Sequence, residues 1–210
     1  LKIHFENIDR VKKKVNAIVT FSKEEDLRKA REFDNKDIKE KEKMILGGLP
    51  IAHKDAFLTK NLKTPFGSKI YENFVPCEDS IIVERFKNNG AITFGKTNVP
   101  ELTAGSQTYN EVFGATLNPW DTTKSCAGSS GGSAVALATG QAWLASGSDL
   151  GGSLRNPASF CSVVGFRPSP GRVAYGAAGA GAYPSGCTGF PERHYAFPGQ
   201  LGAQVPTLQI

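Results

Sequence analysis

A glycine-rich loop between an expected strand and an expected helix constrains the fold of this chain more than any other feature. Residues 141–146 are mostly small or apolar and predict a strand, which leads into Asp149-Leu150-Gly151-Gly152-Ser153. The two glycines carry no Cβ, so the backbone can take positive φ values and a ligand can approach the amides closely. Asn156 and Pro157 then predict a helix start, with Asn156 as the N-cap and Pro157 as the first helical residue. The stretch predicts a strand, a tight loop and a helix in succession.

The same alternation recurs through the middle of the chain. Strands are expected over 45–52, interrupted by two glycines, and over 91–95, on either side of a helix over 80–89. A fully buried helix of small residues is expected over 131–140, and a further short strand over 163–166. This pattern predicts an α/β fold with a mixed, largely parallel sheet flanked by helices.

The N-terminal part is expected to be mostly helical. A weak apolar stripe runs through 5–21, and Ser22 with Glu25 has the pattern of a capping box before a helix over about 23–33. The remaining long segments are expected to be loops, at 34–43, 59–74 and 105–120.

Residues 174–210 differ in character from the rest. They are rich in glycine, alanine and proline, and they have no helical or strand periodicity. We therefore expect a folded domain over 1–173 and an irregular Gly/Pro-rich tail over 174–210.

The composition is that of an ordinary soluble globular protein, with 40% hydrophobic and 21% charged residues. No apolar run approaches the length that spans a membrane. The chain begins Leu1-Lys2-Ile3-His4, without methionine or the hydrophobic region of a signal peptide. We therefore expect a truncated reading frame or a trimmed product, located in the cytoplasm.

The charges and cysteines argue against two classes of site. The net charge is +5, but acidic and basic residues are intermixed, which indicates a solvated surface and not a nucleic-acid interface. The chain has four cysteines without a C-x-x-C pair and three histidines, so no metal site is expected. Cys126 and Cys161 lie among small or apolar residues and are expected to be buried free thiols.

Two residues have chemistry that their surroundings would activate. Ser153 would present a hydroxyl beside the free N–H groups of a helix N-terminus, which suits a developing oxyanion. Lys54 closes a strongly apolar strand, and burial there would lower its pKa, leaving a neutral amine able to act as a base. The alternatives are a glycine turn with an incidental serine, and a lysine that extends into solvent.

Several motifs in a fixed order carry a resemblance to a known family. Between Gly47 and Val173 the chain resembles the amidase signature family, in particular bacterial general amidases. The motifs are Gly48-Leu49-Pro50-Ile51-Ala52-His53-Lys54-Asp55, Gly95-Lys96-Thr97-Asn98-Val99-Pro100-Glu101, Gly105-Ser106-Gln107-Thr108, Gly128-Ser129-Ser130-Gly131-Gly132-Ser133 and Gly147-Ser148 continuing through the loop to Pro157. The resemblance implies an amidase signature fold over 1–173, incomplete at the C-terminus.

The resemblance also implies a mechanism, which is hydrolysis of a small-molecule amide through a Ser-Ser-Lys triad. Ser153 attacks the carbonyl, Ser129 relays the proton between Ser153 and Lys54, and neutral Lys54 is the base. An acyl-serine intermediate is then hydrolysed by water. The peptide bond into Ser129 is implied to be cis. The N–H groups implied to hold the oxyanion are those of Leu150, Gly151, Gly152 and Ser153. No metal or organic cofactor and no nucleic-acid or membrane partner is implied.

Supporting residues have plainer interpretations. Arg155 is expected to pair with Asp149, and His53 is expected to face away from Lys54 because side chains alternate along a strand.

Two other hypotheses stay open at this point. Residues 128–132 fit G-x-S-x-G, with Ser130 as nucleophile and Asp149 and His194 as its partners. Alternatively the chain is a catalytically incompetent amidase fragment that is unstable or needs a partner, because an incomplete sheet exposes apolar faces and strand edges.

Overall fold

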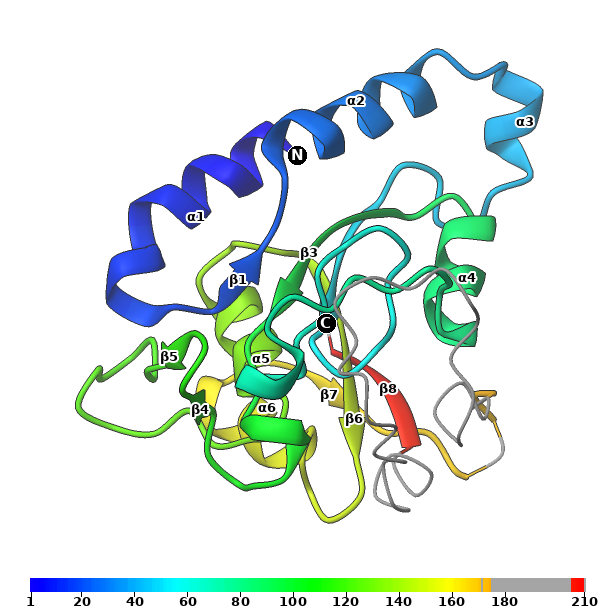
Figure 1. The fold of residues 1–210 in the computed structure, drawn as a ribbon. Helices are drawn as coiled ribbons and strands as arrows, with labels where there is room; N and C mark the ends of the chain where they lie inside the picture. The colour runs from blue at the N-terminus through cyan, green and yellow to red at the C-terminus, as the bar shows by residue number, and fades with distance from the viewer. Residues whose placement is uncertain (171, 175–204, 210) are drawn as a thin grey trace.

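The computed structural model describes residues 1–170 and 172–174 and the backbone of 205–209. It contains one mixed six-stranded sheet in the order β1-β3-β2-β6-β8-β7 (Figure 1). Its strands are β1 (Ile18–Thr20), β2 (Pro50–Lys54), β3 (Ile92–Thr97), β6 (Leu144–Asp149), β7 (Gly165–Phe166) and β8 (Val205–Gln209). The central strand β2 runs parallel to both β3 and β6, whereas β1 and β8 pair antiparallel with their neighbours. The predicted mixed sheet with helices on its faces is confirmed.

Helices cover both faces of this sheet, as Figure 1 shows for α4 and α5. The helices are α1 (Lys2–Val15), α2 (Lys23–Asp34), α3 (Ile38–Glu42), α4 (Ile81–Asn88), α5 (Gly131–Ala138) and α6 (Arg155–Cys161), with 3-10 turns at Lys69–Tyr71 and Glu101–Thr103. Alternation along β2 sends Ile51 and His53 toward the α4 side, while Ala52 packs with Val135 of α5. The same alternation sends Lys54 to the α5 side.

The main core lies between α1, α5 and the sheet. Phe5 and Ile8 of α1 pack there with Phe94 of β3 and Val135 of α5. The small residues of α5 let this helix lie against the sheet without protruding side chains, and six of its residues are buried. A Cβ on Gly132 would lie 2.3 Å from the backbone nitrogen of Asn98, so glycine is required for this close approach.

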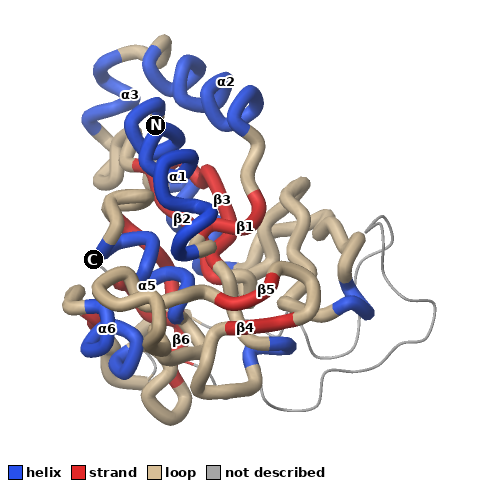
Figure 2. Tube along the Cα trace, turned by 90° about the vertical axis from the view of Figure 1, so that its left-hand side faces the viewer, coloured by secondary structure: helices blue, strands red, loops and turns tan. Residues whose placement is uncertain are grey.

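A separate two-stranded ribbon is formed by β4 (Tyr109–Asn110) and β5 (Gly114–Ala115). Figure 2 shows this ribbon beside β1 and the end of α1. Asn16 joins the two parts, because its side-chain amide donates to the Phe113 carbonyl at 2.7 Å and its own carbonyl accepts from Thr116 at 2.7 Å. The expected loop over 105–120 therefore contains a short hairpin.

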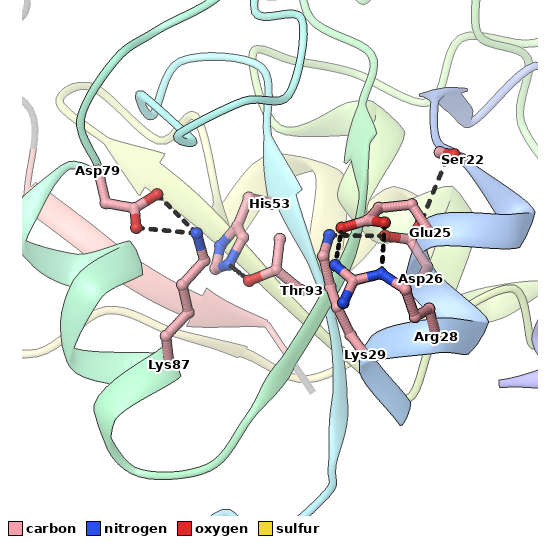
Figure 3. Close-up of polar contacts among 9 residues, drawn as sticks. All are labelled: Ser22, Glu25, Asp26, Arg28, Lys29, His53, Asp79, Lys87 and Thr93. Carbon is pink, nitrogen blue, oxygen red and sulfur yellow. Dashed lines mark hydrogen bonds and ion pairs between the residues drawn. The ribbon is translucent and has the colours of Figure 1, made fainter. Parts of the chain in front are cut away.

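The N-terminal expectations need correction. Helix α1 ends at Val15, because Asn16 takes a left-handed conformation with φ 50°, and Ile18 then begins β1. Ser22 is the N-cap of α2, but its side chain makes no capping bond. Asp26, and not Glu25, accepts the Ser22 N–H at 3.2 Å, as Figure 3 shows, so the expected capping box is wrong. The short helix α3 lies inside the segment expected to be a charged loop.

The strand and helix boundaries near the site also differ from expectation. Strand β2 starts at Pro50, and residues 45–48 form turns. Helix α6 starts at Arg155 with Leu154 as its N-cap, so the assignment of Asn156 as N-cap and Pro157 as first helical residue is wrong. The expected strand over 163–166 is reduced to β7.

Part of the expected irregular tail is a strand. Residues 205–209 form β8, which pairs with β6 and β7, so the expectation of irregular structure is wrong there. The pairing with β6 supplies backbone hydrogen bonds that no side-chain pattern in the tail indicates. The rest of the tail, including His194, lies outside the described residues, and the division at residue 173 stays a prediction.

The two expected free thiols are confirmed, since Cys126 and Cys161 are buried and unpaired. Within the described residues no helix is both long and apolar enough to cross a membrane.

Candidate active site

Lys54 ends β2 with a fully buried side chain. Its Nζ donates hydrogen bonds to Ser129 Oγ at 2.7 Å and to Ser148 Oγ at 2.8 Å. Ser129 lies just before α5, and Ser148 lies in β6, which is next to β2 in the sheet. The amine is thus enclosed by protein, and the alternative in which Lys54 extends into solvent is wrong.

Burial sets the protonation of this amine. It lowers the pKa of Lys54 from 10.5 to about 7, and the Asp149 carboxylate opposes the shift only in part. Low-dielectric surroundings disfavour the ammonium form because it loses its hydration. A substantial fraction of Lys54 is therefore neutral near pH 7 and able to accept a proton.

Ser129 follows a tightly packed turn. The Gly128–Ser129 peptide bond is cis, as the resemblance implies. A Cβ on Gly128 would lie 2.9 Å from the Gln107 nitrogen, so the two backbones pass in close contact. The next residue, Ser130, donates its N–H to the Ser153 carbonyl at 2.9 Å, which ties the Ser129 turn to the loop that carries Ser153.

Ser153 opens onto a pocket of about 220 Å³. The residues that line it are Thr103, Ala104, Gly105, Ser106, Gly128, Leu150, Gly151, Ser153 and Asn156. Among the described residues the Ser153 hydroxyl has no hydrogen-bond partner, and in particular none is formed with Ser129. The structure therefore joins Lys54 and Ser129 directly and places Ser153 at the pocket, partly exposed.

The backbone amides of the glycine loop are not equivalent. Those of Leu150, Gly151 and Ser153 have no hydrogen-bond partner within the described part of the chain. The Gly152 N–H, in contrast, donates to Asp149 Oδ1 at 2.8 Å. Gly152 also has φ 112°, which side-chain-bearing residues rarely adopt. In this structure the Gly152 amide orders the loop and is not free for a ligand, which departs from the expected set of oxyanion donors.

Asp149 organises this loop from its buried position at the end of β6. It accepts the N–H groups of Gly152, Leu154 and Arg155, and two side-chain bonds from Arg155 at 2.9 and 3.0 Å. Burial alone would raise the pKa of Asp149, but these hydrogen bonds outweigh it and hold the pKa well below the ordinary value. The predicted pairing of Arg155 with Asp149 is confirmed.

Comparison with known proteins identifies the family. A family model described as Amidase matches residues 1–190. This chain belongs to the amidase family. The match extends past Val173, where the recognisable motifs of the sequence end.

The matched amidase relatives are much longer than this chain. A glutamyl-tRNA(Gln) amidotransferase subunit of Geobacillus kaustophilus is 48% identical over 170 residues, which are 81% of this chain and 35% of that protein. A 6-aminohexanoate cyclic dimer hydrolase structure matches with a TM-score of 0.79 at 26% identity, covering 99% of this chain and 39% of that one. Peptide amidase from Stenotrophomonas maltophilia matches with a TM-score of 0.74 at 28% identity, covering 86% and 37%. The chain spans about a third of the length of the curated relatives it matches.

The amidase site leaves little room for the G-x-S-x-G alternative. Ser130 is fully buried, its hydroxyl donates to the Ser148 carbonyl at 3.2 Å, and its oxygen accepts the Ser148 N–H at 3.2 Å. A nucleophile must instead be open to substrate. The other expected partner, His194, lies outside the described residues.

His53 faces away from Lys54, as expected. Its ring nitrogens are each 3.1 Å from a hydroxyl, that of Ser146 on one side and that of Thr93 on the other; Figure 3 shows the Thr93 contact. Burial lowers the pKa of His53 well below its ordinary value, so the ring is neutral. Its contacts are those of a core residue.

Sequence reasoning missed Ser148. This hydroxyl is the second partner of the Lys54 amine, and no motif argument assigned it a role. The available signal was its place one residue before Asp149 in a strand that is otherwise small or apolar. The described residues contain no cluster of histidine, cysteine or carboxylate side chains that could hold a metal ion.

Proposed function

We propose that this chain carries the catalytic centre of an amide hydrolase with Ser153 as nucleophile, Ser129 as relay and Lys54 as base. The observation that carries the proposal is the 2.7 Å contact between the buried Lys54 amine and Ser129, next to the pocket onto which Ser153 opens. Membership of the amidase family supports the same assignment.

The proposed reaction proceeds in two stages. Ser153 Oγ attacks the amide carbonyl while its proton passes to Ser129, whose own proton passes to neutral Lys54. The proton then moves to the leaving nitrogen as the C–N bond breaks, and an acyl-serine remains. Water enters by the same proton route and releases the carboxylic acid. No step requires a metal or an organic cofactor.

The tetrahedral oxyanion needs N–H donors, and the unpaired amides of Leu150, Gly151 and Ser153 are the available ones. One such donor typically contributes about 2.7–4 kcal/mol of transition-state stabilisation. Gly152 would join them only if its N–H left Asp149.

The pocket supports an uncharged substrate. Its lining consists of hydroxyls, one carboxamide, small residues and a single large apolar side chain, Leu150, and it contains no charged side chain. A charged group entering it would lose hydration without gaining a partner. We therefore assign small, neutral, non-peptide carboxylic amides as substrates, hydrolysed in the cytoplasm.

Covalent labelling tests the triad. The purified chain is treated with a serine-reactive fluorophosphonate, and the modified residue is mapped by peptide mass spectrometry. We expect label on Ser153 that falls at least about 100-fold in Lys54→Ala, as for loss of a general base. Label on Ser130 would instead favour the G-x-S-x-G hydrolase. A cooperatively melting chain without label would mean that this chain is an incompetent amidase fragment.

A second candidate function is the glutaminase part of an amidotransferase, favoured by the 48% identity to a glutamyl-tRNA(Gln) amidotransferase component. In that case the chain would work with partner proteins, and glutamine would be its amide. Ammonia release from glutamine, compared with release from an uncharged amide such as butyramide, separates the two candidates.

A further inference from the structure

The residue after Lys54 is a second buried acid, Asp55, which lies outside the proposed triad. It is fully buried, and its Oδ2 accepts the Gly67 N–H at 3.1 Å. The Phe66 N–H also acts on this carboxylate, so two consecutive amides of one turn face Asp55. Lys96, another fully buried residue, lies close enough to influence it electrostatically.

The turn that Asp55 holds has an unusual backbone. Phe66 has φ 53° and Gly67 has φ 64°. A left-handed conformation is rare for a bulky aromatic residue and costs free energy, so the surroundings must enforce it. The Asp55 carboxylate is the group that both amides of this turn face.

This turn is bonded to a second strained turn. The Leu102 N–H donates to the Phe66 carbonyl at 2.8 Å, and the Ser68 hydroxyl donates to Glu101 Oε1 at 2.8 Å. Leu102 packs against the apolar cluster that contains Phe66. Leu102 and Thr103 have φ values of 52° and 59°, again in the left-handed region.

The second turn leads directly into the pocket. Residues 103–106 form one of its walls, and Leu150, Gly151 and Ser153 also line it. A continuous path of hydrogen bonds therefore runs from Asp55 through the 66–68 turn to Leu102 and on to this wall. Because Asp55 follows Lys54 directly, neighbouring residues fix both the proposed base and the wall opposite the nucleophile.

We propose that Asp55 is a positioning residue: its carboxylate holds the 66–68 turn, and this turn holds residues 103–106 in the shape that binds the acyl part of the amide. The inference rests on the proposed function for its substrate, but the geometry it claims can be measured without activity. Backbone strain that persists beside a pocket is itself a sign of a functional constraint.

The first test is amide hydrogen exchange followed by mass spectrometry. Asp55→Ala should accelerate exchange at least about tenfold in peptides covering 64–68 and 100–106, because an amide loses its acceptor. Asp55→Asn keeps an oxygen for the Gly67 N–H and should exchange like the wild type. Asp79→Ala is the matched control, since Asp79 is also a loop anchor, accepting from Lys60 N and Lys87 Nζ (Figure 3), but does not contact either turn.

The outcomes decide the inference. Unchanged exchange over 100–106 in Asp55→Ala, or equal acceleration in Asp79→Ala, would overturn it. Acceleration in Asp55→Asn would also overturn it, because charge and not the hydrogen bond would then be responsible. If Asp55→Ala does not fold, Ser68→Ala breaks the link to Glu101 from the other side and should loosen 100–106 in the same way.

The second test separates positioning from general weakening of the fold. In fluorophosphonate labelling of Ser153, Asp55→Ala should raise the half-saturating reagent concentration about tenfold and leave the limiting rate within about twofold. The reverse split would contradict the inference. If the wild type is not labelled at all, the proposed function fails, while the exchange experiment still decides what Asp55 holds.

Discussion

A lysine amine serves as a base only when its surroundings remove its charge, and Lys54 meets that condition by burial. Its two hydrogen-bond partners are neutral serine hydroxyls, so they do not restore the ammonium form as a paired carboxylate would. The opposing charge of Asp149 is already shared among five donors, two of them on Arg155. The site therefore keeps its acid for loop order and its amine for proton transfer.

The pH dependence of Ser153 labelling follows from this arrangement. With the pKa of Lys54 at about 7, the neutral base is scarce at low pH. We expect the labelling rate to rise about tenfold per unit below pH 7 and to level off above about pH 8. Rates measured from about pH 5.5 to 9.5 with a fixed fluorophosphonate check this. A rate that keeps rising toward pH 10 would indicate a lysine with an ordinary pKa.

Lys96 gives a prediction for stability. Burial lowers its pKa to about 8, whereas the unfolded chain keeps a lysine proton up to about pH 10.4. Between these values the unfolded state binds more protons, so stability rises with pH, and the cost of burying Lys96 is greatest below about pH 8. We expect Lys96→Met to reduce this slope, by up to about 1.4 kcal/mol per pH unit. Urea unfolding at about pH 8 and 9 measures it, with the exposed-lysine variant Lys69→Met as control; equal slopes in Lys96→Met and wild type would refute it.

At the scale of elements, the site depends on how closely α5 approaches the sheet. This helix starts immediately after Ser129, so its position fixes where that hydroxyl meets Lys54. Small residues permit the approach, and Gly132 against Asn98 is its tightest point. Any displacement of α5 would lengthen the contact between the relay serine and the base.

Gly132→Ala tests this dependence. The added Cβ would overlap the Asn98 backbone, and overpacking of this kind costs about 1–3 kcal/mol. We expect the free energy of unfolding to fall by about 3 kcal/mol and Ser153 labelling to slow at least tenfold. Gly151→Ala is the control, because nothing lies within 4 Å of its Cβ position and its stability should change by less than about 0.5 kcal/mol. Chemical denaturation of both variants decides the matter.

At the scale of the whole molecule, apolar side chains remain at the surface near α6 and β7. Phe160, Val164 and Phe166 are 52%, 64% and 58% exposed. These two elements are in contact, so the three side chains come from one region of the fold. Exposed apolar groups gathered in this way favour association.

We therefore expect this chain to self-associate with increasing concentration. Phe160→Lys combined with Val164→Lys should weaken the association at least about tenfold, because each lysine must be desolvated in the contact. Ile45→Lys is the control, since Ile45 is 87% exposed but lies in the turn before β2. Sedimentation velocity over a concentration series measures the effect, and a strictly monomeric wild type would disprove it.

The sequence determined those features that depend on local pattern and on residue chemistry. The alternation of strands and helices, the buried helix α5, the partnership of Arg155 with Asp149 and the orientation of His53 all follow from periodicity, residue size and charge. The family motifs led to Lys54, Ser129 and Ser153 as candidates. Local patterns succeed here because each concerns residues that lie close in sequence or on one face of one element.

Only the tertiary structure decided the features that depend on pairing between distant segments. Ser148 became a partner of Lys54 because β6 lies next to β2, and β8 formed because β6 offered it backbone partners. The Gly152 amide was taken by Asp149, and the Asp55 carboxylate reached the 66–68 turn, through geometry that no periodicity encodes. Hydrogen bonds between segments depend on relative position in space, and that position is fixed only when the whole core packs.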